Sequence, residues 1–369
     1  MKSRSCALLA SLLVGSMAGH SQTTATTPTA STIELAGRMR VARSVATATA
    51  IGGHRMLIAG GMTEGGGALR EFEIFDASTN RIVASGDMDR ARHSHSATRL
   101  RDGRVLILGG YDGSYLKSAA IFDPRTGRFS DAGAMNVGRS GHTATLLHDG
   151  TVLIVGGVGD RWSFLSSAEV YDPRTRRFVA VAPMNSARES HTATLLPDGR
   201  VMIAGGHRDR RENIVVYAST EVYDPARRRF SAGPMLTTAR HKHEAVALAD
   251  GRILVLGGSD PRDRVQLASA EVYDAAAHAW VAVSPMRAGR YKVRDTAVRL
   301  PDGRVLVAGS GQVAELFDPG TNIFSPVSGR LDQQYEFASA ALLDDGHALV
   351  LGGYDRRGHS TDGIWRFRE

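Results

Sequence analysis

Short apolar runs alternate with turn residues along most of the chain, and the same arrangement recurs every 43 to 52 residues. In the segment HTATLLPDGRVMIAGG, residues 191–206, one run ends at an Asp-Gly pair and a second run follows it. Asp-Gly between two apolar runs is a strong hairpin signal, because glycine adopts the positive φ that the turn requires at little cost. Each unit therefore begins with two antiparallel strands.

The remainder of each unit predicts two more strands. A diglycine closes the second run in six units, and Gly309-Ser310 takes its place in the other one. A variable loop then leads to a third strand, which ends at Tyr-Asp-Pro or Phe-Asp-Pro in four units, and an aromatic residue marks the fourth. Four antiparallel strands repeated in this way are typical of the blades of a β-propeller.

The two ends of the chain complete the count of blades. The last unit stops after a third strand at residues 364–366, whereas residues 33–35 near the start resemble a fourth strand. Pairing the two ends in one blade closes the ring and removes its exposed edges. We therefore expect an all-β protein, a seven-bladed propeller spanning residues 32–369 whose N-terminal strand closes the last blade.

A period near 50 residues with a terminal diglycine is the signature of the kelch repeat, and the chain resembles kelch propellers over this whole region. That family includes copper radical oxidases that oxidise galactose, periplasmic sialic-acid mutarotases and protein-binding scaffolds. The oxidases require a tyrosine that is cross-linked to a cysteine, but the only cysteine here is Cys6. The resemblance thus implies the fold without this copper chemistry, and we expect neither a cofactor nor a metal.

The first residues predict export. Lys2 and Arg4 precede an apolar run, and small residues end at Ala18, so residues 1–18 are typical of a signal peptide and residues 19–31 form a Thr-rich linker. We therefore expect a periplasmic or secreted monomer with no membrane span. Although the net charge is +7, the sequence contains no nucleic-acid-binding module, and we expect no nucleic-acid partner.

Positions at which the units differ from the repeat are the candidates for ligand binding. Four innermost strands open with an Arg and carry a His three positions later, as at Arg188 and His191, and a feature that recurs around a ring indicates a structural role. The two positions after this Arg vary, and we align Leu331 with them in blade seven. The variable loops share a face with these positions. The candidate ligand-binding residues on this face are His93, Glu189, His241, Lys242, Tyr291, Lys292 and Arg294, with Trp162 from a loop.

These residues support two functional hypotheses. The first is a binding module that recognises an anionic carbohydrate or a protein on the loop face, since lysine and arginine attract carboxylates. The alternative is a sugar-acid enzyme, a uronate lyase or a sialic-acid mutarotase, in which His, Tyr or Lys moves the proton. A metal held by His93, His95, His241 and His243 was also considered, because residues two apart on a strand point the same way. Lys242 argues against that site, since it would oppose a cation.

Overall fold

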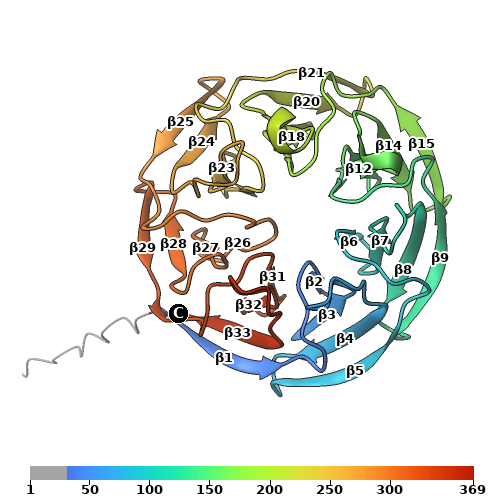
Figure 1. Ribbon diagram of the computed structural model, residues 1–369, viewed down its shortest axis with the longest axis vertical. Helices are drawn as coiled ribbons and strands as arrows, with labels where there is room; N and C mark the ends of the chain where they lie inside the picture. The colour runs from blue at the N-terminus through green and yellow to red at the C-terminus, as the bar shows by residue number, and fades with distance from the viewer. Residues whose placement is uncertain (1–30) are drawn as a thin grey trace, which may run out of the picture.

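The computed structural model describes residues 31–369, which form a ring of seven blades around a central axis (Figure 1). The predicted signal peptide, and all of the predicted linker except Ser31, lie outside the described residues. The prediction of an all-β, seven-bladed propeller is confirmed.

Each blade is an antiparallel sheet whose strands follow one another outward from the axis. Blade one consists of β2 (Thr47–Ala50), β3 (Arg55–Ala59), β4 (Glu71–Asp76) and β5 (Arg81–Asp87). Blade two consists of β6 (Ser96–Arg99), β7 (Val105–Leu108), β8 (Ser118–Asp123) and β9 (Arg128–Ala134). Blade three consists of β10 (Thr143–Leu146), β11 (Val152–Val155), β14 (Ala168–Asp172) and β15 (Arg177–Val181).

The next three blades repeat this order. Blade four consists of β16 (Thr192–Leu195), β17 (Val201–Ala204), β20 (Thr220–Asp224) and β21 (Arg229–Ala232). Blade five consists of β22 (Glu244–Ala247), β23 (Ile253–Leu256), β24 (Ala270–Asp274) and β25 (Ala279–Val283). Blade six consists of β26 (Ala297–Arg299), β27 (Val305–Val307), β28 (Glu315–Asp318) and β29 (Ile323–Pro326).

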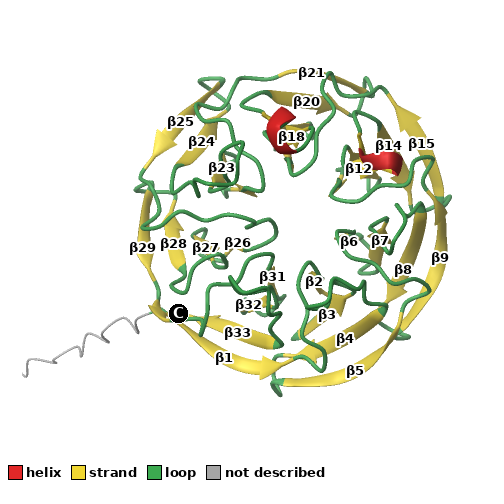
Figure 2. Cartoon of the chain, in the orientation of Figure 1, coloured by secondary structure: helices red, strands yellow, loops and turns green. Residues whose placement is uncertain are grey.

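The helical content of the described residues is confined to two loops (Figure 2). The loop of blade three contains β12 (Val158–Gly159), the 3₁₀-helix η1 (Asp160–Trp162) and β13 (Ser163–Phe164). The loop of blade four contains β18 (His207–Arg208), η2 (Arg211–Asn213) and β19 (Val215–Val216). Neither helix has the length and apolar character needed to cross a membrane.

Blade seven joins the two ends of the described chain, as predicted. It consists of β31 (Ser339–Leu342), β32 (Ala348–Leu351), β33 (Gly363–Arg368) and β1 (Thr32–Arg38). Strand β1 pairs antiparallel with β33, and its other edge pairs in parallel with the short β30 (Ser328–Gly329). In Figure 1 the blue strand β1 lies directly outside the red strand β33. The side chain of Ile33 is buried in this blade's core, so β1 contributes apolar packing as well as hydrogen bonds.

The apolar core lies between neighbouring blades. The second strand of blades two to seven is buried along its whole length. In one cluster, Leu57 of blade one packs with Ile107 and Phe122 of blade two. The blades are therefore held together by burial of apolar surface, without a disulfide among residues 31–369.

The diglycines allow adjacent blades to approach closely. Gly205 has a φ of +60°, and a Cβ atom on it would lie 2.5 Å from the carbonyl oxygen of Arg240 in the next blade. The N–H of Gly206 donates a hydrogen bond of 2.9 Å to that same oxygen. Glycine is required at this position because a side chain would both strain the backbone and push the blades apart.

The repeated arginines are structural, as predicted. Arg188 is fully buried and donates to the carbonyl oxygens of Gly205 and Ser219, and its Nη2 lies 2.9 Å from the Glu221 carboxylate. Equivalent buried arginines are present in the first six blades: Arg43, Arg92, Arg139, Arg188, Arg240 and Arg290. The arginines therefore satisfy loop carbonyls that would otherwise lose their hydrogen bonds on burial.

Blade seven corrects one part of the predicted alignment. In blade four, a β-bridge joins Glu189, the residue after the repeated Arg, to His207, the residue after the diglycine. In blade seven, the equivalent bridge joins Glu336 to Tyr354. Glu336, not Leu331, therefore occupies this position, and Tyr335 stands where the other blades have Arg. The Tyr335 ring packs on Trp365 with their centroids 5.4 Å apart. An aromatic pair has replaced the buried ion pair, which is why the arginine-based alignment failed.

Candidate functional site

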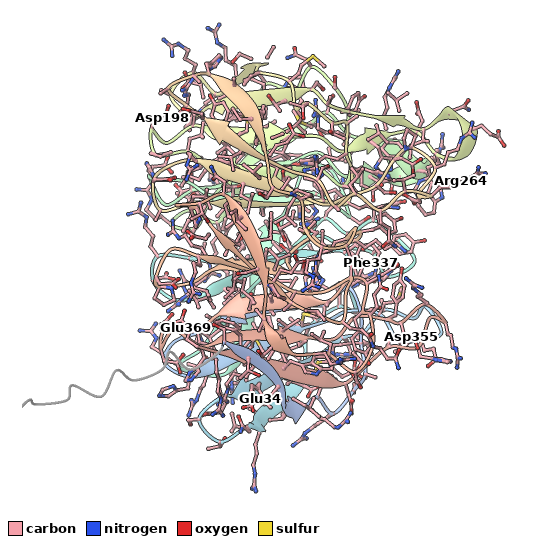
Figure 3. The ribbon with its side chains drawn as sticks, turned by 90° about the vertical axis from the view of Figure 1, so that its left-hand side faces the viewer. Glu34, Asp198, Arg264, Phe337, Asp355 and Glu369 are labelled. Atoms are coloured by element: carbon pink, nitrogen blue, oxygen red, sulfur yellow. The ribbon has the colours of Figure 1, made fainter. Side chains whose placement is uncertain are left out.

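The loop-bearing face of the ring is where the chain enters each innermost strand. Figure 3 shows the ring edge-on, with Arg264, Phe337 and Asp355 on this face and Asp198 on the opposite one. The second residue after each repeated Arg, or after Tyr335, has a positive φ in every blade; these residues are Val45, Ser94, Gly141, Ser190, Lys242, Lys292 and Phe337. The backbone therefore bends sharply at this level, and the residues on either side of the bend point in different directions.

This bend also argues against the four-histidine metal site, which the sequence already disfavoured. His95 is buried, and its Nε2 lies 3.0 Å from Thr47 Oγ1 in the preceding blade. His243 bonds Thr192 in the same way, at 3.1 Å. His93 and His241 lie on the far side of the bend, because Ser94 and Lys242 are not in extended strand conformation. The repeated histidines thus link neighbouring blades through hydroxyl groups.

A cavity of about 260 Å³ lies at the mouth of the central channel. Three of the eight predicted residues line it, Glu189, Lys242 and Arg294. His207 and Arg210, which come from the loop of blade four, also line it. The structure thus gathers charged side chains from blades four, five and six around one space.

Lys242 is the centre of a hydrogen-bonded cluster on blade five. Its Nζ donates to Asp263 Oδ2 and to the Tyr291 hydroxyl, each at 2.7 Å. Asp263 Oδ1 lies 2.9 Å from Nε2 of His241, which is itself completely buried. Burial lowers the pKa of Lys242, although Asp263 partly opposes this shift. Only Lys242 reaches the cavity, while His241 and Tyr291 lie behind it and hold it in place.

Glu189 and His207 continue this cluster towards blade four. The Nδ1 atoms of His207 and His241 are 3.2 Å apart, and Nε2 of His207 lies 3.6 Å from Glu189 Oε2. Burial lowers the pKa of His207 to about 3, so its ring is neutral at physiological pH. Burial also raises the pKa of Glu189, with nearby cations, Arg210 first among them, opposing the shift. A carboxyl group and an amine with opposite pKa shifts therefore border one cavity.

Lys292 forms hydrogen bonds at the rim of the mouth and does not line the cavity. Its Nζ donates to Glu336 at 2.7 Å and to the Tyr354 hydroxyl at 2.6 Å. Burial would lower the pKa of Lys292, but these two partners raise it above its ordinary value. This lysine is therefore a stable cation that is already neutralised by Glu336.

Arg294 occupies the axis of the propeller. It belongs to blade six, yet its Nη2 donates at 2.8 Å to the carbonyl oxygen of His142 in blade three. Arg294 and the neighbouring Asp295 line both the mouth cavity and a second cavity of about 270 Å³ below it. Nε of Arg294 is 3.5 Å from Asp295 Oδ2, without a hydrogen bond between the two side chains. The guanidinium group thus forms the floor of the mouth and keeps donors free for a ligand.

The remaining predicted residues form an aromatic side of the mouth. His93 packs on Tyr111, which contacts Tyr115, and Tyr115 meets the edge of Trp162 with ring centroids 5.9 Å apart. Trp162 is 57% exposed, and the Arg210 guanidinium lies over its ring at 4.4 Å. One part of the indole therefore packs against Tyr115 and Arg210, and the rest is exposed.

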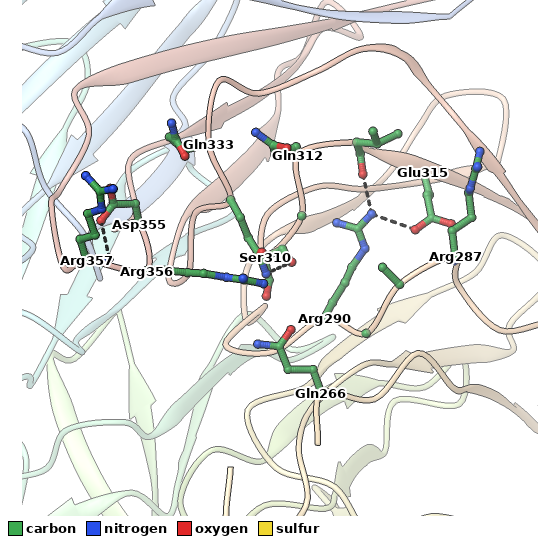
Figure 4. Close-up of a pocket in the computed structure, with 15 residues that line it drawn as sticks. Gln266, Arg287, Arg290, Ser310, Gln312, Glu315, Gln333, Asp355, Arg356 and Arg357 are labelled. Carbon is green, nitrogen blue, oxygen red and sulfur yellow. Dashed lines mark hydrogen bonds and ion pairs between the residues drawn. The ribbon is translucent and has the colours of Figure 1, made fainter. Parts of the chain in front are cut away.

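A larger groove of about 1020 Å³ opens beside the mouth, between blades five, six and seven (Figure 4). It exists because the loop of blade six spans only residues 308–314, whereas that of blade five spans residues 257–269. Figure 4 shows Arg356 extending towards Ser310, and Gln266 and Gln312 on either side. The other polar residues of the lining include Gln333, Gln334, Arg287 and Arg357. Amide and guanidinium donors of this kind suit a hydroxylated or anionic ligand.

Sequence reasoning missed two members of the site. Asp263, the partner of both His241 and Lys242, comes from a variable loop that no repeat signal distinguishes. Glu336 was missed because blade seven was aligned on Arg330, whereas the diglycine at 352–353 followed by Tyr354 matches Gly109, Gly110 and Tyr111 in blade two. Aligning the repeats on their glycines would have found Glu336.

Comparison with solved structures supports the fold. A fungal alcohol oxidase of the AA5 family, solved in complex with copper, superposes with a TM-score of 0.70 over 91% of this chain and 75% of that chain. The sequence identity is 16%, so the likeness concerns the fold alone. Cys6 is the only cysteine, and the residues of this chain do not fit the cross-linked copper site described above.

Comparison by sequence identifies the family. No curated protein matches the chain in sequence. The model of the Attractin/LZTR1 β-propeller matches residues 56–310, which is more than half of the chain. The match begins within β3 of blade one, covers blades two to five and ends just after the two inner strands of blade six. The chain therefore belongs to the Attractin/LZTR1 β-propeller family of kelch-type propellers.

Proposed function

We propose that the mouth of the propeller binds an acidic carbohydrate, with the carboxylate of the sugar on Arg294. The observation that carries this proposal is the position of Arg294 on the axis, where its only side-chain hydrogen bond goes to the His142 carbonyl oxygen. The other cations of the mouth donate hydrogen bonds to carboxylates, as Lys242 does to Asp263 and Arg210 to Glu189, whereas Asp295 lies 3.5 Å from Nε of Arg294 without a hydrogen bond. Among these cations, Arg294 is therefore best able to donate a bidentate pair of hydrogen bonds to a ligand carboxylate.

The aromatic side of the mouth favours a sugar over other anions. Trp162 lies under Arg210, which lines the cavity, and its exposed part offers an apolar surface on which a pyranose ring can pack. A cavity of about 260 Å³ is of the size of one monosaccharide unit. The polar groove beside the mouth offers space for further sugar units of a chain. We also propose that the protein acts after export, on the basis of the signal-peptide pattern in residues 1–18.

Isothermal titration calorimetry with oligosaccharides of uronic acids and with sialic acids tests this proposal. The acidic sugars should bind, and Arg294→Gln should weaken them by about 1.5–3 kcal/mol, or roughly 10- to 150-fold, as expected for a charged hydrogen bond. Arg264→Gln, on the same face but outside the cavity, should leave the affinity unchanged (Figure 3). If neutral oligosaccharides bind equally well, or if Arg294→Gln has no effect, the proposal is wrong. If no sugar binds, the alternative of a protein partner takes its place.

A second candidate function is catalysis on the same acidic sugar. It is favoured by the opposite pKa shifts of Lys242 and Glu189, because such pairs are typical of acid and base catalysts. In a lyase reaction, Lys242 would first have to lose its own proton and would then take the proton beside the carboxylate. The released electron pair would form a carbon–carbon double bond as the glycosidic C–O bond breaks, and protonated Glu189 would supply the leaving oxygen with its proton. The ultraviolet absorbance of the unsaturated product distinguishes this activity from binding alone.

A further inference from the structure

The face opposite the mouth carries the hairpin turns between the first two strands of each blade. In blades two, four, five and six these turns read Asp-Gly-Arg, and the aspartate bonds the guanidinium two residues later. For example, Arg200 Nε donates to Asp198 Oδ2 at 2.7 Å. In these four blades an arginine of the same turn thus neutralises the turn carboxylate, whereas in blade three Thr151 takes its place and donates to Asp149.

Blades one and seven depart from this rule together. Blade seven reads Asp345-Gly346-His347, so a histidine replaces the arginine. Blade one reads Gly53-His54 where the other blades have Asp-Gly, so that it loses the carboxylate and gains a histidine. Both histidines contact the same Asp345 carboxylate, although His54 and Asp345 are 291 residues apart in the chain. This distance in sequence is why no motif revealed the cluster.

The geometry of these three residues is that of a metal-binding set. One ligand atom from each residue lies within 4.8 Å of the other two, and this is the one such group among residues 31–369. Oδ1 of Asp345 accepts the backbone N–H of His347 at 3.0 Å, which fixes the carboxylate, while Oδ2 contacts Nδ1 of His54 and lies 2.9 Å from Nδ1 of His347. Nδ1 of His347 is shielded from solvent and faces Oδ2 of Asp345, but the two groups are not aligned as a hydrogen bond.

We propose that His54, Asp345 and His347 bind a divalent transition-metal ion of the zinc class, which joins blade one to blade seven. Two imidazoles and one carboxylate suit such an ion, and a water molecule completes its coordination. Ligand atoms around tetrahedral zinc lie about 3.3 Å apart, farther than the 2.9 Å between Asp345 Oδ2 and His347 Nδ1, so the imidazoles must move outward slightly to admit the ion. His54 is half exposed on a turn and has room for this movement. The ion would hold together the two blades that flank the point where the chain closes the ring.

Titration of tag-free, metal-free protein with Zn²⁺ tests the proposal by calorimetry and by the shift in thermal unfolding. We expect one ion per chain at this site, and a rise in the melting temperature as the free Zn²⁺ concentration exceeds the dissociation constant. His54→Ala should abolish both effects. His347→Arg should also abolish them while keeping a stable fold, because it restores the Asp-Gly-Arg turn of the other blades.

The control is His148→Ala, which removes an exposed histidine beside Asp149 in the equivalent turn of blade three. This variant should bind Zn²⁺ like the unaltered protein. Absence of Zn²⁺ binding by the unaltered protein would overturn the proposal, as would full binding by His54→Ala or His347→Arg. These measurements require no sugar ligand, so the metal site stands or falls separately from the function of the mouth.

Discussion

The buried ion pairs should be decisive for stability, and Glu271 provides the clearest test. Its carboxylate is 1% exposed and lies 2.8 Å from Nη2 of Arg240. It also accepts the backbone N–H groups of Thr237 at 2.6 Å and Thr238 at 3.1 Å. Replacement of Glu271 with alanine would leave a buried guanidinium without its counter-charge and two N–H groups without an acceptor.

The expected loss of unfolding free energy is about 3–5 kcal/mol, the range for removing one partner of a buried ion pair. The assay is urea denaturation, with the midpoint compared at an unchanged slope. Asp89→Ala is the matched control. Blade two has Ala120 where other blades have this glutamate, and Arg92 pairs instead with Asp89, which is half exposed. Loss of Asp89 should cost less than loss of Glu271, because the Asp89 carboxylate is half exposed to solvent and the buried Arg92 keeps its hydrogen bonds to Gly109 and Ser118.

The double variant Arg240→Met with Glu271→Met tests the reason for the effect. Because it removes both charges, it should be less destabilising than Glu271→Ala alone. If Glu271→Ala costs no more than Asp89→Ala, or if the double variant is the least stable of all, the uncompensated charge is not the source of the loss.

Three further predictions concern pH, the blade contacts and ring closure. Burial and the neighbouring arginine hold the pKa of His191 well below 6.5, so the folded state keeps this ring neutral. The free energy of unfolding should therefore fall as the pH drops below about 6.5. In urea denaturation at a series of acidic pH values, His191→Gln should reduce the slope of unfolding free energy against pH by about 1.4 kcal/mol per pH unit. Gly205→Ala should destabilise the fold by more than about 1 kcal/mol in urea denaturation, because the added Cβ would collide with the Arg240 carbonyl oxygen. Gly65→Ala is the control: its Cβ would lie in open space, so it should change stability by less than about 0.5 kcal/mol. Removal of residues 1–38 deletes β1 and exposes the edge of β33, so the truncated protein should aggregate in size-exclusion chromatography while the full chain does not.

The fold was predictable because the same pattern of turns and strands recurs in each repeat of the sequence. The Asp-Gly turns, the diglycines and the aromatic fourth strands each recur, so an error in one unit is corrected by the others. The one misaligned blade illustrates this point, since Tyr335 and Trp365 lack the repeat's residues and only the glycines of blade seven preserve its register.

The site was predictable only in part, because it depends on contacts that the repeat does not specify. The sequence identified Lys242 and Arg294 as departures from the repeat, but it could not show that Arg294 crosses the axis to His142. It also ranked His241 and Tyr291 with the accessible residues, whereas burial places them behind Lys242. Side-chain direction at the bend depends on the positive φ of Lys242, which an extended-strand reading does not anticipate.

Departure from the repeat is therefore evidence for function only when the departing residue lacks a compensating partner in the core. Tyr335 departs from the repeat as strongly as Arg294 does, but Trp365 packs against it and restores a buried contact, so the change is structural. Arg294 gains no hydrogen-bonded carboxylate, since Asp295 stays 3.5 Å from its Nε and its Nη2 donates to the His142 carbonyl oxygen. His347 is similar: it replaces an arginine that neutralised its turn, and its shielded Nδ1 faces Oδ2 of Asp345 without the alignment of a hydrogen bond. Both sites proposed for this propeller follow from that distinction, one for an anion on the mouth face and one for a cation on the opposite face.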